Sequence, residues 1–368
     1  MRSEVEHEAT VQRTRHAILS LVRQRGPGIK LPTVLEMCAQ FRVTRTQLEQ
    51  ALVQVERAGL LNRRRGSGIY GTARASQQTI GVVFGGDIFS PPFSPFWSLL
   101  LQAAREQVGD RGLVPRAYLD MAVGDGPLGG HAQLVEDLEA CRLDGLLLLS
   151  PRHHGQEVAA LRVYGVPVVV FGGKAPADWV VELDWAAFFG LAAQAVAATR
   201  CRRLGLLAVP DLRQDLAGAF RAAGRRVPRL DDWSYATWAR AIPGAGTHED
   251  CARRLVERLL AGGATPPLPD TLISLEDTMT RGVLTALHQA GLRPGRDLRI
   301  ITAENQGSPV LAPYAAELTR IVFDPRDCMQ AALGMLATLM TGGTPARSPL
   351  LIAPQLHQPQ QAVTRRTP

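Results

Sequence analysis

The sequence predicts two fold classes in one chain: a small α+β head, followed by a larger α/β domain of two lobes, each built on a doubly wound parallel sheet. Two observations predict this. Residues 1–71 show helical spacing and then two short strand candidates, whereas apolar strands and longer helices alternate from residue 79 onward. Such alternation is typical of parallel sheets. The remainder of the 368-residue chain is longer than one open sheet commonly holds, so two lobes are expected.

The head is predicted to contain three helices and a β-hairpin. Apolar residues recur at helical spacing in Ala9–Arg25, and a Gly-Pro-Gly segment ends that helix. The second helix is predicted over Thr33–Phe41 and begins with a capping box, a threonine followed three residues later by a glutamate. The third helix is predicted over Thr44–Ala58, with Thr44 as its cap. Leu60–Arg63 and Ile69–Gly71 are strand candidates around a glycine-rich turn. This order indicates a winged helix-turn-helix.

We expect the winged helix-turn-helix to occupy residues 1–71, and the small, polar residues 72–78 to form a linker. The two-lobed domain is expected over residues 79–363, with a tail at 364–368. Lobe 1 would comprise about 79–184 plus about 309–337, and lobe 2 about 185–308 plus about 338–363. The most apolar segments, such as Val166–Phe171, are far too short to span a bilayer and are interpreted as buried parallel strands.

The positive charge of the chain is concentrated in the head. Residues 1–76 contain 13 Lys and Arg but only 6 Asp and Glu, which accounts for the whole net charge of +7. The remaining residues are balanced. A local basic excess of this kind is the electrostatic signature of phosphate binding, so double-stranded DNA is the expected partner.

The cysteines and the first residues bear on the compartment. The five cysteines are widely spaced, their number is odd and no CxxC occurs, so neither a disulfide framework nor a zinc site is expected. The first ten residues, MRSEVEHEAT, are charged and polar rather than typical of a secretory signal. These features predict a cytoplasmic protein, and the sequence indicates no membrane partner and no cofactor.

The DNA-contacting residues are expected at two places in the head. A helix-turn-helix presents the N-terminus of its second helix to the major groove, where hydroxyl, amide and guanidinium groups reach bases and phosphates. An arginine-rich hairpin tip can lie along the backbone or enter a minor groove. The residues predicted to contact DNA are Thr33, Thr44, Arg45, Thr46, Gln47, Arg63, Arg64, Arg65, Gly66, Ser67 and Gly68.

The segment Lys30–Gly71 resembles the winged-helix domain of the gluconate-repressor (GntR) family. The shared residues include Leu31-Pro32-Thr33, Ala39-Gln40-Phe41, Val43-Thr44-Arg45-Thr46, Ala51-Leu52, Glu56, Gly59-Leu60 and Arg63–Gly68. The sequence departs from the family pattern at Leu35 and at Glu49-Gln50, where the family usually has arginines that touch DNA. The resemblance implies operator binding, and the departures put the operator sequence in question.

The region from Gln78 to Val363 resembles the effector domain of the lactose/galactose-repressor (LacI/GalR) family, which is periplasmic-binding-protein-like. The resemblance is carried by Ile80–Phe84, Ser94–Trp97, Arg142–Pro151, Gly165–Phe171, Leu275–Ile300 and Leu318–Leu336. In that fold a ligand sits between two lobes, at the carboxyl ends of the strands. The resemblance therefore implies a small-molecule effector.

Polar loops after the predicted strands supply the candidate ligand-binding residues. They are Asp87, Ser94, Phe96, Asp184, Arg213, Asp215, Glu276, Glu304 and Asn305. Carboxylate and amide groups suit a hydroxylated effector such as a carbohydrate, and Phe96 could stack on a sugar ring or pack beneath its loop. Thr302–Asn305, Glu276 and Asp215 depart from the residues usual in sugar-binding members, so a ligand other than a simple hexose is also considered.

The sequence contains no arrangement typical of catalysis. It has no GxSxG, P-loop or HExxH motif, and the adjacent His153-His154 pair has no evident third ligand, so neither an enzyme nor a metal site is expected. The leading hypothesis is a homodimeric transcription regulator, with repression as the expected mode, whose DNA affinity is controlled by a small molecule bound between the lobes. The alternative is a ligand-binding protein whose winged helix serves protein–protein contacts.

Overall fold

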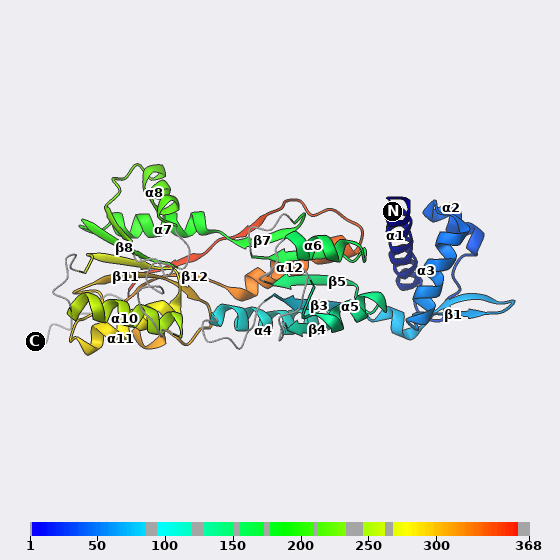
Figure 1. Ribbon diagram of the computed structural model, residues 1–368, viewed down its shortest axis with the longest axis horizontal. Helices are drawn as coiled ribbons and strands as arrows, with labels where there is room; N and C mark the ends of the chain where they lie inside the picture. The colour runs from blue at the N-terminus through cyan, green and yellow to red at the C-terminus, as the bar shows by residue number, and fades with distance from the viewer. Residues whose placement is uncertain are drawn as a thin grey trace, which may run out of the picture. The chain divides into compact units, whose positions relative to one another are not determined.

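The computed structural model describes residues 2–85, 94–119, 128–149, 155–172, 177–208, 212–232, 246–261 and 268–359 (Figure 1). It confirms the predicted fold class: a helical head with a two-stranded wing is followed by two lobes, each with a six-stranded sheet. The chain divides into two compact units. Unit 1 holds residues 1–87, 101–182 and 328–350, and unit 2 holds residues 88–100, 183–327 and 351–368. None of the described helices is long and apolar enough to cross a membrane.

The head, in unit 1, has the predicted order of elements. They are α1 (Arg2–Arg25), α2 (Val34–Phe41), α3 (Arg45–Arg57), and the antiparallel strands β1 (Leu61–Arg64) and β2 (Gly68–Gly71). Its core is formed by apolar side chains at helical spacing, including fully buried Ile18, Leu48 and Leu52. The first helix starts at Arg2 rather than at Ala9.

Both predicted helix starts in the head are confirmed by capping boxes. The Thr33 hydroxyl accepts a hydrogen bond from the Glu36 N–H at 3.3 Å, and the Glu36 carboxylate accepts from the Thr33 N–H at 2.7 Å. Thr44 and Gln47 repeat this arrangement at the start of α3. Between the two helices Arg42 adopts a left-handed conformation with φ of 55°, which ends α2 and turns the chain into α3.

The predicted linker contains a short 3-10 helix, η1 (Ala73–Ser76), and the head contacts lobe 1 within unit 1. The Arg15 side chain is almost fully buried, and one of its guanidinium nitrogens donates to the Tyr164 carbonyl at 3.0 Å. Arg23 pairs with the buried carboxylate of Asp144. Cys141 of lobe 1 packs into the apolar core of the head. The head is therefore joined to lobe 1 by side-chain contacts as well as by the chain itself.

Lobe 1 is built on a sheet with the strand order β13-β7-β6-β5-β3-β4. Its strands are β3 (Thr79–Phe84), β4 (Val114–Leu119), β5 (Gly145–Leu149), β6 (Val168–Phe171), β7 (Val180–Leu183) and β13 (Leu350–Ile352). The neighbouring pairs from β4 to β7 are parallel. The helices of this region are α4 (Pro95–Asp110), α5 (Ala132–Glu139) and α6 (Gly155–Arg162).

Lobe 2 repeats the pattern with the strand order β14-β12-β11-β10-β8-β9. Its strands are β8 (Arg203–Leu207), β9 (Arg229–Asp232), β10 (Thr271–Ser274), β11 (Arg299–Asn305), β12 (Thr319–Phe323) and β14 (Gln355–His357). Among the described strand pairs of lobe 2, only the pair of β12 and β14 is antiparallel. The helical segments are α7 (Trp185–Ala197), α8 (Arg213–Ala222), α10 (His248–Ala261), α11 (Asp277–Gln289) and η2 (Ala312–Tyr314). The last helix, α12 (Pro325–Met340), follows β12 but belongs almost entirely to unit 1, with lobe 1.

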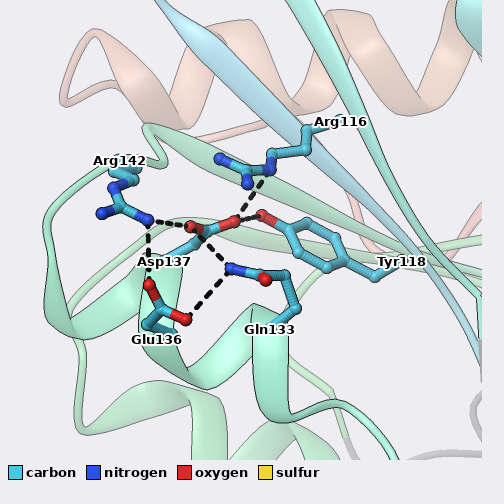
Figure 2. A network of polar contacts seen from close by, with 6 residues as sticks. All are labelled: Arg116, Tyr118, Gln133, Glu136, Asp137 and Arg142. Carbon is cyan, nitrogen blue, oxygen red and sulfur yellow. Dashed lines mark hydrogen bonds and ion pairs between the residues drawn. The ribbon is translucent and has the colours of Figure 1, made fainter.

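A charged cluster lies on the α5 side of lobe 1, and Figure 2 shows it closely. Its residues are Arg116, Tyr118, Gln133, Glu136, Asp137 and Arg142. Asp137 is completely buried at the centre and accepts from Arg116 Nε at 2.8 Å and Arg142 Nη1 at 2.9 Å. The Tyr118 hydroxyl donates to the same carboxylate at 2.5 Å, and burial together with this bond raises the pKa of the Tyr118 phenol. The cluster ties α5 to the edge strand β4.

Candidate nucleic-acid interface and ligand-binding residues

The N-terminus of α3 presents the predicted DNA-contacting side chains. Thr44, Arg45 and Thr46 are exposed there, and Gln47 is half-buried. The carboxamide oxygen of Gln47 accepts hydrogen bonds from the N–H and the hydroxyl of Thr44, at 3.0 and 3.1 Å. These two residues therefore shape the helix start, whereas Arg45 and Thr46 project from a rigid, capped end. Positive helix-dipole charge at the same end favours phosphate oxygens.

Thr33 has the same capping role at the start of α2, and its hydroxyl also contacts the Glu36 carboxylate at 2.9 Å. Hydrogen bonds from the Thr33 backbone and hydroxyl lower the pKa of Glu36, which stays ionised. Leu35, two residues after Thr33, is 81% exposed. A large apolar side chain thus stands in the open at the position where the GntR pattern has an arginine.

The wing brings the remaining predicted residues to a tight turn. Gly66 and Gly68 both have positive φ, 74° and 134°, which a side chain would disfavour. The Ser67 N–H donates to the Arg64 carbonyl at 3.0 Å and closes the turn. Arg65 is exposed at its tip, and the Arg64 guanidinium lies over the Tyr70 ring, 5.0 Å from its centroid. Arg64 is therefore held in place by stacking, with its N–H groups still available.

Arg63 differs from its two neighbours. Its Nη1 pairs with the Glu49 carboxylate at 2.7 Å, and its Nε lies 3.3 Å from the Glu56 carboxylate, while its Nη2 is buried with no hydrogen-bond partner among the described residues. The Arg63 N–H also donates to Glu56 at 3.3 Å. Both glutamates belong to α3, so Arg63 fastens the base of the wing to that helix. Its charge is matched within the head before any DNA is present.

Sequence reasoning missed several residues that complete this surface. Lys30 forms an antiparallel backbone β-bridge with Tyr70, and a Cβ on Gly68 would come within 2.5 Å of the Lys30 side chain, which therefore lies against the start of β2 beside the turn of the wing. Its lone basic charge directly before the Leu-Pro segment was the available signal. Arg42 in the turn and Tyr70 beneath Arg64 carried no comparable sequence signal, because their importance arises from backbone conformation and stacking.

In unit 2, three of the predicted ligand-binding residues lie at the carboxyl ends of adjacent strands. Glu276 follows β10 and precedes α11, while Glu304 and Asn305 end β11. Asn305 donates to Asp277 at 3.2 Å, and Ser308 donates to the same carboxylate at 2.8 Å. Asp277 is fully buried, which raises its pKa. Asp277 thus anchors the loop after β11 to the start of α11.

The two carboxylate oxygens of Glu276 differ in their contacts. His248 Nδ1 lies 2.5 Å from Oε2, whereas Oε1 is buried and has no hydrogen-bond partner among the described residues. Glu304 is committed to a second ion pair, because Arg320 Nη1 lies 2.7 Å from its Oε2. The sequence placed Glu304 in a loop after Thr302, but β11 extends through Asn305, so that expectation was wrong.

The other predicted ligand-binding residues have varied positions. Asp184 caps α7 by accepting from the Ala187 N–H at 2.8 Å, and Asp215 is exposed in the first turn of α8. Phe96 is buried and packs edge-on against Trp97, while Ser94 precedes α4. Asp87, the side chain of Arg213 and the His153-His154 pair lie outside the described residues.

An aromatic candidate was missed beside Asp184. Trp185 is half-buried at the start of α7 and packs edge-on against Phe323, with ring centroids 5.3 Å apart. Phe323 ends β12, so both rings lie at the strand ends that also carry Glu276 and Asn305. The aromatic residue directly after the predicted crossover at Asp184 was the signal that could have identified it.

Two family models match separate parts of the chain. Residues 8–70 match the model described as "Bacterial regulatory proteins, gntR family", and residues 193–359 match "Periplasmic binding protein-like domain". No curated protein matches the chain.

Solved structures share the fold of the two lobes. A regulatory protein of the LacI family from Chloroflexus aggregans is 20% identical, with a TM-score of 0.59 over 77% of this chain and 98% of its own. A LacI-family transcriptional regulator from Arthrobacter sp. FB24, in complex with lactose, is 19% identical, with a TM-score of 0.58 over 77% and 98%. The lac repressor dimer bound to operator and the anti-inducer ONPF is 19% identical, with a TM-score of 0.57 over 77% and 93%. The chain therefore combines a head that matches the gntR family of bacterial regulatory proteins with two lobes that have the fold of LacI-family regulators.

Proposed function

We propose that this regulator is a homodimeric repressor whose affinity for a DNA operator is controlled by a small hydroxylated molecule bound in its two-lobed domain. The observation that carries the proposal is the exposed, capped N-terminus of α3 beside an arginine-bearing wing. This is the geometry by which a winged helix-turn-helix reads a major groove and holds the flanking backbone. Repression follows because a bound dimer can block polymerase access.

DNA binding is tested with a duplex selected from a random pool by repeated capture on the full-length chain. Its affinity should fall steeply as salt is raised, because phosphate contacts release counterions. Replacement of Arg65 by alanine should lower the slope of log K against log salt by about 1 for each protomer bound. Arg105→Ala, an exposed arginine of α4 in lobe 1, is the matched control and should leave the slope unchanged. Selection of no duplex, or a slope unaffected by Arg45→Ala and Arg65→Ala together, would contradict operator binding.

The effector proposal is supported by the open Oε1 of Glu276 and by the half-buried Trp185 ring at the same edge of the lobe 2 sheet. A buried acceptor and an aromatic face suit hydroxyl groups on a ring, and the Arthrobacter neighbour was solved with lactose. A panel of sugars and sugar acids should contain a compound that raises the melting temperature of the full chain. That rise should be lost in Glu276→Gln, and not in Glu317→Gln, which is exposed before β12 at the opposite end of the strands.

The dimer is proposed because a single winged helix covers few base pairs, and two-fold operators match two-fold proteins. The lac repressor neighbour is a dimer on its operator. Sedimentation equilibrium of the full chain should give about twice the monomer mass of 39.8 kDa at micromolar concentration. A monomer both alone and on the selected duplex would contradict this part of the proposal.

A further inference from the structure

A small cavity lies where the head meets lobe 1, within unit 1. We name it the junction pocket; its volume is about 290 Å³, and it is lined by four arginines, Arg23, Arg74, Arg116 and Arg142, together with Asp144. Arg23 and Arg74 come from the head and from the short helix η1, whereas Arg116 and Arg142 come from β4 and from the loop after α5. Cations from two parts of the chain thus converge on one space.

The positive charge of the junction pocket is only partly matched. Asp144 is the acidic residue that lines it, and it already pairs with Arg23 and accepts from the Thr79 N–H at 2.8 Å. Arg116 pairs through Nε with Asp137, and Arg142 pairs through Nη1 with both Asp137 and Glu136, at 2.9 and 3.2 Å; neither carboxylate lines the cavity (Figure 2). The charges of Arg116 and Arg142 are thus matched from outside the pocket, and Arg74 supplies the unmatched charge. A guanidinium has five N–H donors, so Arg116 and Arg142 keep free donors after these contacts.

Arg74 forms no ion pair with any carboxylate in the part of the chain that the structure describes, and it is exposed. Its guanidinium lies close to Gly59, at the end of the helix that carries the DNA-contacting residues. Arg74 therefore brings an unmatched charge to the head side of the pocket.

The size and charge of the cavity define the chemistry of an occupant. Planar guanidiniums bind phosphate and carboxylate groups through paired N–H···O bonds, and several of them around one site favour a multiply charged oxyanion. The volume is at the lower end of small-molecule sites, so the occupant must be compact.

The occupant is not the operator. Ala58, which lines the pocket, caps the C-terminal end of α3, whereas Arg45 and Thr46 lie at its N-terminus. A helix of 13 residues separates these ends by about 20 Å. A duplex contacted by the start of α3 is therefore held a helix length away from the junction pocket.

We propose that the junction pocket binds a small phosphate-type oxyanion, which ties the head to lobe 1 independently of the effector proposed for lobe 2. The bound anion bridges Arg74 of the linker helix η1, next to the head, with Arg116 and Arg142 of the lobe. Because it requires both sides of the pocket, it stabilises the docked arrangement of the head. Anything that favours or opposes docking, DNA included, must then change the affinity for the anion by the same factor as the anion changes it in return.

Binding is tested on the full-length chain by calorimetric titration with two probes, inorganic phosphate and glycerol phosphate, at an ionic strength kept constant with chloride. We expect saturable binding of at least one probe with one site per chain; the stronger probe distinguishes free phosphate from a phosphate ester. Arg74→Gln and Arg116→Gln should each weaken binding about tenfold, since each removes charge-assisted hydrogen bonds. Arg105→Gln removes an equal charge from lobe 1 outside the pocket and should leave the affinity unchanged.

No saturable heat with either probe at millimolar concentration would overturn the proposal, as would binding that persists in the Arg74→Gln/Arg116→Gln double variant. The melting temperature of each variant without probe checks that it folds, and Arg74 is exposed, so Arg74→Gln keeps the test valid if Arg116→Gln does not fold. Saturating phosphate should also slow amide hydrogen exchange in residues 73–79, which join head and lobe. Unchanged exchange in these residues would refute the bridging role. None of these measurements uses DNA or a sugar, so their failure is distinct from failure of the proposed function.

Discussion

His16 makes the attachment of the head to lobe 1 sensitive to acid. It lies on α1 beside Gly165 of lobe 1, and its Nδ1 lies 3.1 Å from the Gln12 carbonyl. Its Nε2 is buried and has no hydrogen-bond partner within the described residues. Protonation would place a second N–H where nothing accepts it. Burial, followed by the charge of the adjacent Arg15, lowers the pKa of His16 from 6.5 to about 4.

The lowered pKa of His16 fixes the sign and size of the effect. Between the folded pKa of about 4 and the unfolded pKa of 6.5, the unfolded chain binds more protons, so the free energy of unfolding falls as the pH falls through this window. These two pKa values give a loss of about 2 kcal/mol between pH 7.5 and pH 5, and of about 3 kcal/mol below pH 4.

Urea unfolding of the full chain followed by circular dichroism, at pH 7.5 and at pH 5, measures this loss. The His16→Gln variant keeps a side-chain amide to donate to the Gln12 carbonyl but cannot be protonated. Its loss of stability over the interval should be about 2 kcal/mol smaller than that of the wild type. His288→Gln, an exposed histidine near the end of α11, should behave as the wild type. Equal losses for the wild type and His16→Gln would refute the reasoning.

Three further predictions follow from particular contacts. Leu35→Arg, at an 81% exposed position in the first turn of α2, should leave the melting temperature unchanged and increase the salt dependence of binding to the selected duplex by about 1 for each protomer. Gly282→Ala should destabilise the chain by about 1–3 kcal/mol in urea unfolding, because its Cβ would come within 2.1 Å of the Glu249 carbonyl on α10, whereas Gly334→Ala on α12 meets nothing and should stabilise by about 0.5–1 kcal/mol. Asp137→Asn should cost at least about 2 kcal/mol in the same assay, because it leaves Arg116 and Arg142 without their shared buried carboxylate.

The sequence was sufficient for the elements whose signals are local. The two capping boxes at Thr33 and Thr44 fixed the helix starts of the head, and apolar runs such as Leu146–Leu149 identified the central strands. Edge strands were missed, because β4 and β9 carry charged residues and few buried ones: Arg229–Asp232 reads as a polar loop until it is seen paired with β8. Their pairing depends on a neighbouring strand, which composition alone does not record.

The sequence predicted where the candidate site residues lie, but not which residues they pair with. Parallel topology was enough to place Glu276 and Asn305 at one edge of the lobe 2 sheet. It could not indicate that Glu304 is neutralised by Arg320, since these residues meet only through the pairing of β11 with β12. The junction pocket was likewise invisible, because its arginines come from segments far apart in the sequence.

The ion pair between Glu49 and Arg63 explains how the head accommodates a glutamate where the GntR pattern usually has an arginine. A glutamate on α3 at this position would repel phosphates if its charge were unmatched, but Arg63 lies 2.7 Å from it and offsets part of that charge, since Arg63 is shared with Glu56. The same contact engages Arg63 within the head, so the proposed contacts with the DNA backbone fall to Arg45 at the start of α3 and to Arg64 and Arg65 on the wing. Arg63 of the arginine triplet therefore stabilises the head internally, whereas Arg64 and Arg65 present hydrogen-bond donors to solvent. The contribution of the triplet to DNA affinity should come from the second and third members rather than from all three equally.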